Sequence, residues 1–441
     1  MTREEPVAAA EFTPRREQLI VLILAAVQFI TIVDFMIVMP LAPQLMRTFN
    51  INTAQFGLIV SSHTFAAGAA GLVASSIVDR FARRTSFMAM FAGFLLGTLW
   101  CAVAPTYETL VAARIVAGAF GGILGGMAMA IIGDVFPEER RGRATGSLMT
   151  GFALASVAGV PLGLYLGTEF GWHIPFVALV IAGLPALLAT PFALPPLNAH
   201  VGKEHSPPLR SLVDTFSIPN HLKAFGLIIA LMIGNFSVFP YLSAYLVGNV
   251  GVTEDQLPFA YIAGGIGTFI AAPIIGRLAD RYGKLTVYRR VAPCAAVMML
   301  AITHLPQVSV VVAVVLFGTM MVCNVGRMIP AMALVTSSVE PRRRGGFLSA
   351  NAAVQHLACG VGAYVGGEII TTGADGQLEN FGVVGWFAAI ATVASIWLAG
   401  RVRIVDGAAA QPVSAEAISL AAAAEAEFDA GEPLLEAASK P

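Results

Sequence analysis

The chain has 441 residues, of which 57% are hydrophobic and only 12% are charged, and its formal net charge at pH 7 is −1. A soluble domain usually has about 25% charged residues, so this chain has too few charges to cover a water-exposed surface. The composition therefore predicts an integral membrane protein, and the lack of a basic excess excludes nucleic acid as a partner.

Apolar runs long enough to span a bilayer recur along the chain. One spanning helix needs about 20 mainly apolar residues, and the polar segment 1–18 before the first run is not typical of a cleavable signal. The runs lie near 19–46, 54–78, 86–105, 108–133, 144–168 and 173–194, then 223–247, 256–279, 286–305, 308–337, 347–371 and 382–400. The sequence therefore predicts an all-α protein of twelve transmembrane helices in two six-helix bundles, 19–194 and 222–403.

Two further polar segments lie outside these bundles. Residues 195–221 are rich in proline and histidine and are expected to form a loop or a short surface helix between the halves. Residues 404–441 are rich in alanine and acidic residues, and we expect them to form a disordered tail. The four cysteines lie in apolar runs without the spacing of a metal site, so neither a metal nor a cofactor is expected.

Basic residues collect on one side of the predicted bundle. Of the 26 Lys and Arg residues, 23 fall in the N-terminal segment, the loops after even-numbered helices, the central loop and the tail. The exceptions are Arg47, at the outer end of the first predicted helix, and Arg114 and Arg327, inside predicted helices. Because basic loops stay in the cytoplasm, we expect both termini, the central loop and the tail to be cytoplasmic.

One charged pattern occurs twice on this side. "GRLADRYGK" (276–284) follows the eighth predicted helix and "SSIVDRFARRT" (75–85) follows the second, so that Asp79 and Asp280 are 201 residues apart. A second pair of segments, after the fourth and tenth helices, recurs with an offset of 204 residues. Two equally oriented halves of this kind build many transporters, with the substrate site at the midplane between them.

These motifs resemble those of the major facilitator superfamily. Its signature after the second helix of each half is G-x-L-A-D-R-x-G-[RK]; "GRLADRYGK" fits it throughout, whereas the first copy has Ser75 and Ala82 in place of the glycines. "RIVAGAFGG" (114–122) is similar to the helix 4 arginine motif, and "AGVPLG" (158–163) to the helix 5 motif of antiporters. "DFMIVMPLAP" (34–43) resembles bacterial drug and arabinose-type efflux permeases, which implies a bacterial inner-membrane location.

The resemblance implies a latch at the cytoplasmic ends of the halves. In the state that opens outward, the two motif aspartates would hold helix ends and neighbouring arginines, and these contacts would break when the inside opens. The alternative is that the charges only set the topology, although an acid contributes little to that. The residues expected at this cytoplasmic gate are Asp79, Arg80, Gly276, Asp280, Arg281 and Gly283.

The helix 5 motif has a mechanical interpretation. Pro161 removes a backbone hydrogen bond and kinks a helix, while Gly159 and Gly163 allow close helix packing. The resemblance implies that this segment seals the two halves against each other, as in antiporters. The alternative is the ordinary use of glycine and proline in spanning helices.

Ionisable residues inside the predicted spans are few. Each costs about 2.5–3.5 kcal/mol on insertion scales, so each marks a candidate functional site. Asp34 is the only carboxylate well inside a span and lies about 22 Å from the inner end of its helix, as does His63 on the next helix. A desolvated carboxylate can take up a proton near neutral pH. We therefore expect a proton-coupling site at Asp34, with His63 as a candidate partner and Arg114 holding Asp34 ionised; purely structural roles for Asp34 and His63 are the alternative.

The resemblance also implies a substrate cavity lined by helices 1, 4, 7 and 10, with Asp34, Arg114, Asn235 and Arg327 around one space. On helix 11, Asn351 and Gln355 share a face by their i, i+4 spacing, whereas the next residue points about 100° away. The residues expected around the substrate are Asn235, Arg327, Gln355 and His356.

The function that these features predict is export of a small organic compound, drug-, sugar- or metabolite-like, in exchange for protons by alternating access. No phosphate loop, zinc spacing or nucleophile motif occurs in the sequence, so neither an ATP-driven pump nor an enzyme is expected. We expect the protein to work in the lipid bilayer as a monomer. One alternative is uptake or facilitated diffusion of a sugar or an organic anion, which Arg327 would suit. The other is a membrane sensor or scaffold without transport, indicated only by the altered first copy of the charged motif.

Overall fold

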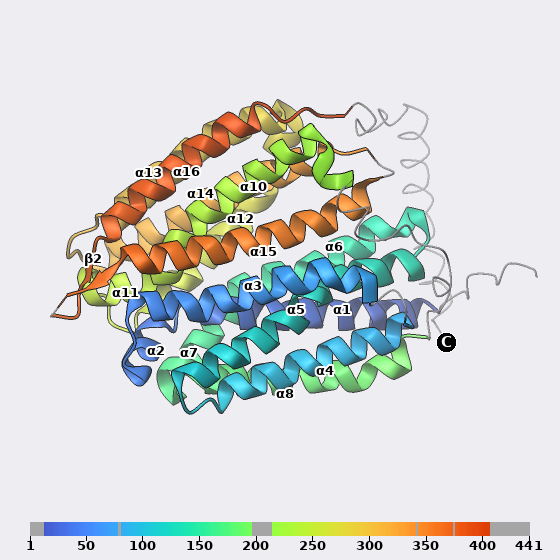
Figure 1. The fold of residues 1–441 in the computed structure, drawn as a ribbon, viewed down its shortest axis with the longest axis horizontal. Coiled ribbons are helices and arrows are strands. Elements are labelled where there is room, and N and C mark those ends of the chain that lie inside the picture. Colours follow the sequence, from blue (N-terminus) through green and yellow to red (C-terminus); the bar gives the residue numbers. More distant parts are fainter. Residues whose placement is uncertain (1–12, 78–80, 196–213, 341–342, 374, 406–441) are drawn as a thin grey trace, which may run out of the picture.

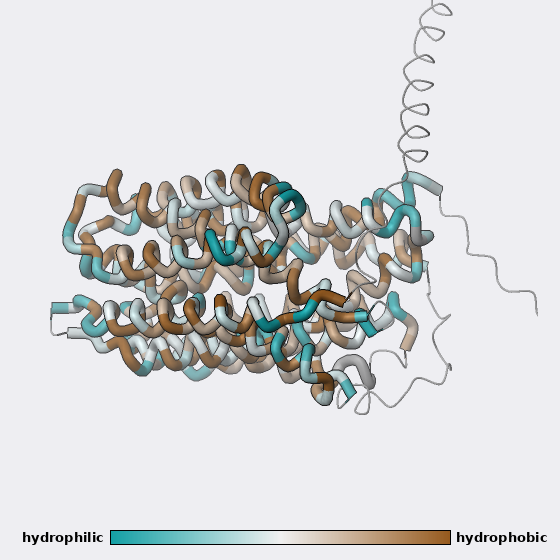
Figure 2. Tube along the Cα trace, turned by 90° about the horizontal axis from the view of Figure 1, so that it is seen from above, coloured by the Kyte–Doolittle hydropathy of each residue, from teal (hydrophilic) through white to brown (hydrophobic). Residues whose placement is uncertain are grey.

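The computed structural model of the chain describes residues 13–77, 81–195, 214–340, 343–373 and 375–405. Almost all of these residues are helical, and the long helices run side by side in one elongated bundle (Figure 1). Hydrophobic residues predominate along the helices and hydrophilic ones are frequent at their ends (Figure 2). In the described part of the chain, eleven helices are long and apolar enough to cross a membrane.

Within its described residues, the first half of the chain has helices as its only regular elements. Its α-helices are α1 (Pro14–Ile37), α2 (Ala42–Phe49), α3 (Thr53–Ile77), α4 (Arg83–Ala102), α5 (Tyr107–Val135), α6 (Glu138–Leu154), α7 (Val160–Phe170) and α8 (Ile174–Ala193). A π-helical turn, Ala155–Gly159, joins α6 to α7. Because Pro161 has no N–H to donate, the regular hydrogen-bond ladder is interrupted at this point.

The second half adds a small hairpin to its helices. Its α-helices are α10 (Pro219–Val238), α11 (Leu242–Tyr245), α12 (Leu257–Tyr282), α13 (Lys284–Thr303), α14 (Val310–Ser337), α15 (Arg344–Ile369) and α16 (Phe381–Ala399). A 3₁₀ turn (Phe239–Tyr241) and a π turn (Leu246–Val250) flank α11, so that α10 continues as one helical segment to residue 250. The strands β1 (Thr371–Thr372) and β2 (Leu378–Glu379) pair antiparallel, Thr371 with Glu379.

The first predicted span, 19–46, is wrong as a single helix. The structure ends α1 at Ile37 and starts α2 at Ala42. Pro40 and Pro43 explain the break, since a proline inside a helix removes a hydrogen bond and clashes with the preceding turn. Arg47 therefore lies on α2, a short separate helix, and not at the end of the first span.

The two ends of the bundle differ. The described chain begins and finishes at one end, which we call the terminal end, and α2 and the hairpin lie at the opposite, distal end (Figure 1). Helix α1 starts at Pro14, inside the segment 1–18 that was expected to precede it, and α10 starts at Pro219, inside the predicted central loop. Most of the predicted tail, 406–441, lies outside the described residues.

The two halves meet mainly along α3 and α15, which lie side by side through the middle of the bundle (Figure 1). Glycines make this contact close: a Cβ on Gly68 would lie 3.1 Å from the carbonyl oxygen of Ala353, and one on Gly367 would lie 2.8 Å from that of Thr53. Helix α15 has 26 residues but is not one of the eleven helices that are apolar enough to cross a membrane, because its apolar run contains Asn351, Gln355 and His356. Twelve spans therefore stay a prediction, with α15 as the twelfth.

Candidate functional site

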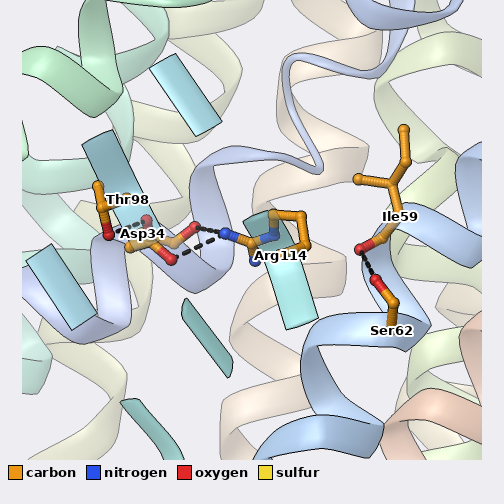
Figure 3. A network of polar contacts seen from close by, with 5 residues as sticks. All are labelled: Asp34, Ile59, Ser62, Thr98 and Arg114. Atoms are coloured by element: carbon orange, nitrogen blue, oxygen red, sulfur yellow. Dashed lines mark hydrogen bonds and ion pairs between the residues drawn. The ribbon is translucent and has the colours of Figure 1, made fainter. Parts of the chain in front are cut away.

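A buried ion pair and a hydrogen bond to it join three helices of the first half. The side chains of Asp34 in α1 and Arg114 in α5 are 0% and 1% exposed, and Arg114 Nη1 lies 2.8 Å from Asp34 Oδ2. The same nitrogen donates to the Asp34 carbonyl at 3.2 Å, and Thr98 Oγ1 in α4 donates to Asp34 Oδ1 at 3.0 Å. Figure 3 shows Thr98 and Arg114 approaching the carboxylate from opposite sides. Both carboxylate oxygens therefore have a donor.

Close helix packing brings these side chains together. Gly97, the neighbour of Thr98, faces the backbone of α5: a Cβ there would lie 2.7 Å from the nitrogen of Ala117. Gly118 in turn faces the backbone of His63 on α3. Since only small residues let helix backbones approach so closely, α3 and α4 can both press against the segment of α5 that carries the buried arginine.

Each member of the pair compensates the buried charge of the other. Protonation of Asp34 would remove the negative charge that compensates Arg114. Breaking a buried pair costs about 3–5 kcal/mol, and a difference of about 5.5 kcal/mol is enough to shift a two-state equilibrium from 1:99 to 99:1. In the described part of the chain, Arg114 Nε has no hydrogen-bond partner. The guanidinium therefore keeps one donor that the ion pair does not use.

His63 does not pair with Asp34, contrary to one possibility raised by the sequence. Its ring stacks on Phe35 with 5.5 Å between ring centroids, and its buried Nδ1 has no hydrogen-bond partner among the described residues. The physical reason is that Thr98 and Arg114 already occupy the carboxylate. A role of His63 in proton coupling stays a prediction that no contact with Asp34 supports.

A second polar network lies in the other half. Arg327 in α14 is 1% exposed; its Nε donates to Asn324 Oδ1 at 3.0 Å and its Nη1 to Thr392 Oγ1 of α16 at 2.7 Å. Its Nη2 lies 3.7 Å from the sulfur of Met299 in α13. Asn324 Nδ2 donates to Asn235 Oδ1 of α10 at 2.6 Å. Within the described residues, no carboxylate forms an ion pair with Arg327.

The four residues expected around one space thus belong to two networks, one in each half. Asp34 contacts Arg114, and Asn235 reaches Arg327 through an intervening amide. An aromatic contact connects α1 to α10: the rings of Phe35 and Phe236 stack across the halves at 5.7 Å between centroids. The two networks therefore flank the interface between the halves.

The expected substrate residues of α15 lie at the same interface. Gln355 and His356 are half-buried, and Asn351 is buried. The Asn351 Oδ1 atom has no hydrogen-bond partner among the described residues. An unpaired buried oxygen of this kind is costly unless another donor reaches it, which keeps α15 a candidate for contact with a ligand.

The expected cytoplasmic-gate residues are only partly described. Asp79 and Arg80 lie outside the described residues. Gly276 has no atom within 4 Å of a Cβ placed on it, and Gly283 occupies the turn between α12 and α13 with a φ of 87°, a conformation that favours glycine. Asp280 and Arg281 are exposed, and neither forms an ion pair in the described part of the chain. The latch therefore stays a prediction for another conformation.

The helix 5 motif lies between α1 of its own half and α12 of the other half. Gly159 packs against Val33 and Gly163 against Ile37, both in α1; a Cβ on Gly163 would be 2.7 Å from Ile37 Cδ1. Across the halves, α12 packs against both the π turn and α7; a Cβ on Gly265 of α12 would lie 3.0 Å from the Ser156 carbonyl. A sealing role for the motif itself stays a prediction.

The halves are joined by polar contacts at the distal end. Arg47 in α2 forms an ion pair with Glu254, which precedes α12. The hydrogen bond and charge of Glu254 raise the pKa of Arg47, so this guanidinium stays protonated. Thr53 Oγ1 donates to the Ile370 carbonyl at 2.5 Å, again across the halves. None of these contacts was anticipated from the sequence.

The terminal end shows a different pattern. In the part of the chain that the structure describes, the ion pairs there each stay within one half: Arg83 with Asp134, Arg140 with Glu17, and Arg343 with Glu340. On α3, a Cβ on Gly71 would meet no atom within 4 Å, whereas one on Gly57, near the distal end, would meet Tyr241 and α15. The halves are therefore packed more closely at the distal end.

Sequence reasoning missed Thr98, Asn324 and Thr392. Asn324 had a signal, because it precedes Arg327 by three residues and so lies on the same helix face. Thr98 and Thr392 had none, since a threonine in a spanning helix usually bonds its own backbone. Among the described residues, no group of three or more His, Cys, Asp or Glu side chains could hold a metal ion. A shallow groove of about 300 Å³ between α12 and α14 is lined mostly by apolar residues and lies away from both networks.

Comparisons with known proteins agree with this architecture. The family model described as Major Facilitator Superfamily matches residues 24–363 and 225–426. The MFS-type transporter YceJ of Bacillus subtilis (strain 168) is 24% identical over 373 residues, 85% of this chain and 93% of YceJ. The inner membrane transport protein YdhP of Escherichia coli (strain K12) is 25% identical over 337 residues, 76% of this chain and 84% of YdhP.

Two solved structures share the fold at 15% sequence identity. One is a bacterial homolog of the human lysosomal transporter Spinster, in an inward-facing and unoccupied conformation, with a TM-score of 0.70 over 90% of this chain and 100% of that chain. The other is a D-xylose–proton symporter, with a TM-score of 0.71 over 86% of this chain and 97% of that chain.

Proposed function

Since the chain belongs to the Major Facilitator Superfamily, whose members are membrane transporters, we propose that it exports a small organic compound in exchange for protons. The observation that carries the proposal is the buried Asp34–Arg114 pair, which is 0% and 1% exposed and in which both carboxylate oxygens have donors. A carboxylate in such a place is functional by default, because a merely structural helix contact is made more cheaply by apolar residues.

The coupling step follows from this geometry. A proton on Asp34 weakens its contact with Arg114, whose Nε has no hydrogen-bond partner among the described residues. The freed guanidinium then bonds to another acceptor of the protein, and substrate is bound only while the Asp34–Arg114 pair is intact, so that proton and substrate exclude each other. Competition of this kind exchanges one for the other instead of carrying both together, which is the requirement for antiport.

The arrangement of the halves supports alternating access. Ion-pair and hydrogen-bond contacts join the halves at the distal end, whereas the described ion pairs of the terminal end stay within one half. Because the sequence assigns 23 of the 26 basic residues to the side of the predicted bundle that holds the chain termini, we place the terminal end in the cytoplasm. The conformation is then inward-facing, and since the similar curated transporters named above are bacterial, we place the protein in a bacterial inner membrane.

Uptake or facilitated diffusion of a sugar or an organic anion is the second candidate; an anion is favoured by Arg327, which forms no ion pair among the described residues. The two are separated by uptake of labelled drugs, sugars and organic acids into inside-out vesicles under an imposed pH gradient. Export predicts accumulation that a protonophore abolishes. Equilibration without accumulation, insensitive to the protonophore, would instead favour the facilitator.

The distal ion pair provides a test of the gate. Exposed pairs contribute about 0–1 kcal/mol, so we expect Arg47→Glu, which puts two carboxylates together, to lower the initial rate of vesicle uptake about two- to fivefold. The charge-swapped double variant, Arg47→Glu with Glu254→Arg, should return the rate to within about twofold of wild type.

A matched control lies at the other end of the bundle. Glu340 pairs with Arg343 at 3.9 Å within one half, and Glu340→Arg should leave the rate unchanged. Equal rates in wild type and Arg47→Glu, or a double variant no better than Arg47→Glu alone, would show that the pair has no part in closing the distal end.

A further inference from the structure

Two residues at the centre of the first half recur in the second half, but an uncharged side chain replaces the negatively charged one. Asn235 lies 201 residues after Asp34, the same offset that relates the two charged motifs, and Phe236 lies 201 after Phe35. The two phenylalanines stack on each other across the halves. The repeat therefore places an amide in one half where the other half has a carboxylate.

Arg327 is not the repeat copy of Arg114. The segments after α5 and α14 are related by an offset of 204 residues, Pro137 to Pro341, and at that offset Arg114 corresponds to Gly318. Met299, which contacts Arg327, lies 201 residues after Thr98. The second half thus has an amide where the first has a carboxylate, and it has an arginine of its own in contact with Met299, the position equivalent to Thr98.

Because of this difference between the halves, one buried charge of the described chain has no partner of opposite charge. Apart from two histidines, the buried acidic and basic residues of the described chain are Glu17, Asp34, Arg114 and Arg327. Glu17 is paired with Arg140 at 2.7 Å, and the next two neutralise each other. Arg327 is surrounded by the neutral groups of two amides, a hydroxyl and a thioether. An uncompensated buried charge is costly, so a group of opposite charge would bind to it favourably.

The guanidinium has the donors for such a group. Of its five N–H groups, Asn324, Thr392 and Met299 each accept one, so one N–H on each terminal nitrogen has no acceptor among the described residues. Two terminal N–H groups are the donors that bind a carboxylate bidentately. The amides of Asn324 and Asn235 are only half-buried, so the network is accessible from their side.

We propose that Arg327, with Asn324 and Asn235, is the recognition site for a carboxylate on the transported compound. The inference rests on the proposed transport function and specifies its substrate class as an organic monocarboxylate with an apolar or aromatic body. The body would lie near the ring of Phe236, which directly follows Asn235 and is half-buried at the interface between the halves.

The test compares benzoate with its neutral isostere benzamide on the purified full chain. Thermal unfolding is followed by intrinsic fluorescence while each compound, or chloride at equal ionic strength, is titrated. We expect benzoate to raise the midpoint of unfolding in a saturable way, and benzamide and chloride to have at least tenfold weaker effects. Equal effects of benzoate and benzamide, saturation by chloride, or no stabilisation by benzoate would each overturn the assignment.

Variants identify the residue. Asn324→Asp places a carboxylate 3.0 Å from Arg327 Nε without changing the size of the side chain, so it should weaken benzoate binding at least tenfold while the protein stays folded. Arg327→Gln should abolish binding, and Arg327→Lys should retain part of it. Unchanged benzoate affinity in folded Asn324→Asp would contradict the proposal even if Arg327→Gln failed to fold.

Binding is measured without a gradient, so its outcome is independent of proton coupling. Benzoate binding that depends on Arg327, in a protein with no proton-driven transport, would retain the anion site and reject export. Proton-driven transport of neutral compounds, undiminished in Arg327→Gln, would retain export and reject the carboxylate site.

Discussion

Asp34→Asn is expected to abolish proton-driven uptake into inside-out vesicles, with at least a hundredfold loss of accumulation under an imposed pH gradient. The asparagine can still accept the hydrogen bond from Thr98, which lies 3.0 Å away, but it can neither take up nor release a proton. Arg114 would then be permanently unpaired, in the arrangement that protonation of Asp34 otherwise produces for only part of the cycle. Exchange of labelled for unlabelled substrate without a gradient should persist.

Stability needs its own control, because Asp34→Asn leaves a buried guanidinium uncompensated. The expected cost is about 3–5 kcal/mol, visible as a lower midpoint of thermal unfolding. Asp34→Asn combined with Arg114→Gln removes both charges and should recover most of the midpoint without recovering accumulation. Asp34→Glu, which keeps a titratable group, should retain measurable accumulation.

The proton assignment would be rejected by one specific result: accumulation in Asp34→Asn equal to wild type and still sensitive to the protonophore. Such a result would move the coupling site to another group of the same interface. His63 would then be the first to examine, because its Nδ1 is buried without a partner among the described residues.

The internal repeat was the most informative feature of the sequence. The offset of 201 residues was read from two aspartates in loops, yet it also relates contacts that no motif marks. Arg83 Nε lies 3.1 Å from Asp134 Oδ2 at the end of α5, and Lys284, 201 residues later, donates to Ser337 at the end of α14 at 2.5 Å. In both halves, therefore, the first residue of one helix, α4 or α13, contacts a residue at the end of the next long helix, α5 or α14.

The partners of the buried charges could be predicted only in part. That Asp34 needs a cation follows from the cost of an ionised group in a membrane, and Arg114 was an available partner. The choice of Thr98 over His63 depends on how closely α4 approaches α5 at Gly97 and Ala117, and periodicity says nothing about that approach. The network of Arg327 depends likewise on packing between α13, α14 and α16.

The distal contacts could not be predicted, because they join residues about 200 or more positions apart across the halves. In the sequence, Arg47 lies at the outer end of the first predicted helix and Glu254 in a predicted loop, with nothing to mark them as partners, and Thr53 is one of many threonines. Only the path of the chain after α1 brings them together, and Pro40, which ends α1 early, determines that path. The end of the first predicted span was wrong for the same reason.

The close glycine contact between α3 and α15 is the basis of the second prediction with a large expected effect on transport. A Cβ on Gly57 would collide with the Tyr241 hydroxyl and lie 3.0 Å from the Ala363 carbonyl. Gly57→Val should therefore hold the distal end open, since overpacking a close contact costs about 1–3 kcal/mol. Each 1.4 kcal/mol changes a population ratio tenfold, so we expect transport to fall about ten- to a hundredfold.

The same variant should expose the distal interface to solvent. Thr53 is 1% exposed and bonded to Ile370 across the halves, so Thr53→Cys, in a chain whose four native cysteines are replaced, should react slowly with an impermeant maleimide. Adding Gly57→Val should speed labelling at least tenfold. Gly71→Val is the control on the same helix: a Cβ there meets nothing within 4 Å, and labelling at position 53 should not change. If Gly57→Val left both transport and labelling as in wild type, the glycine contact between α3 and α15 would have no part in opening and closing the distal end.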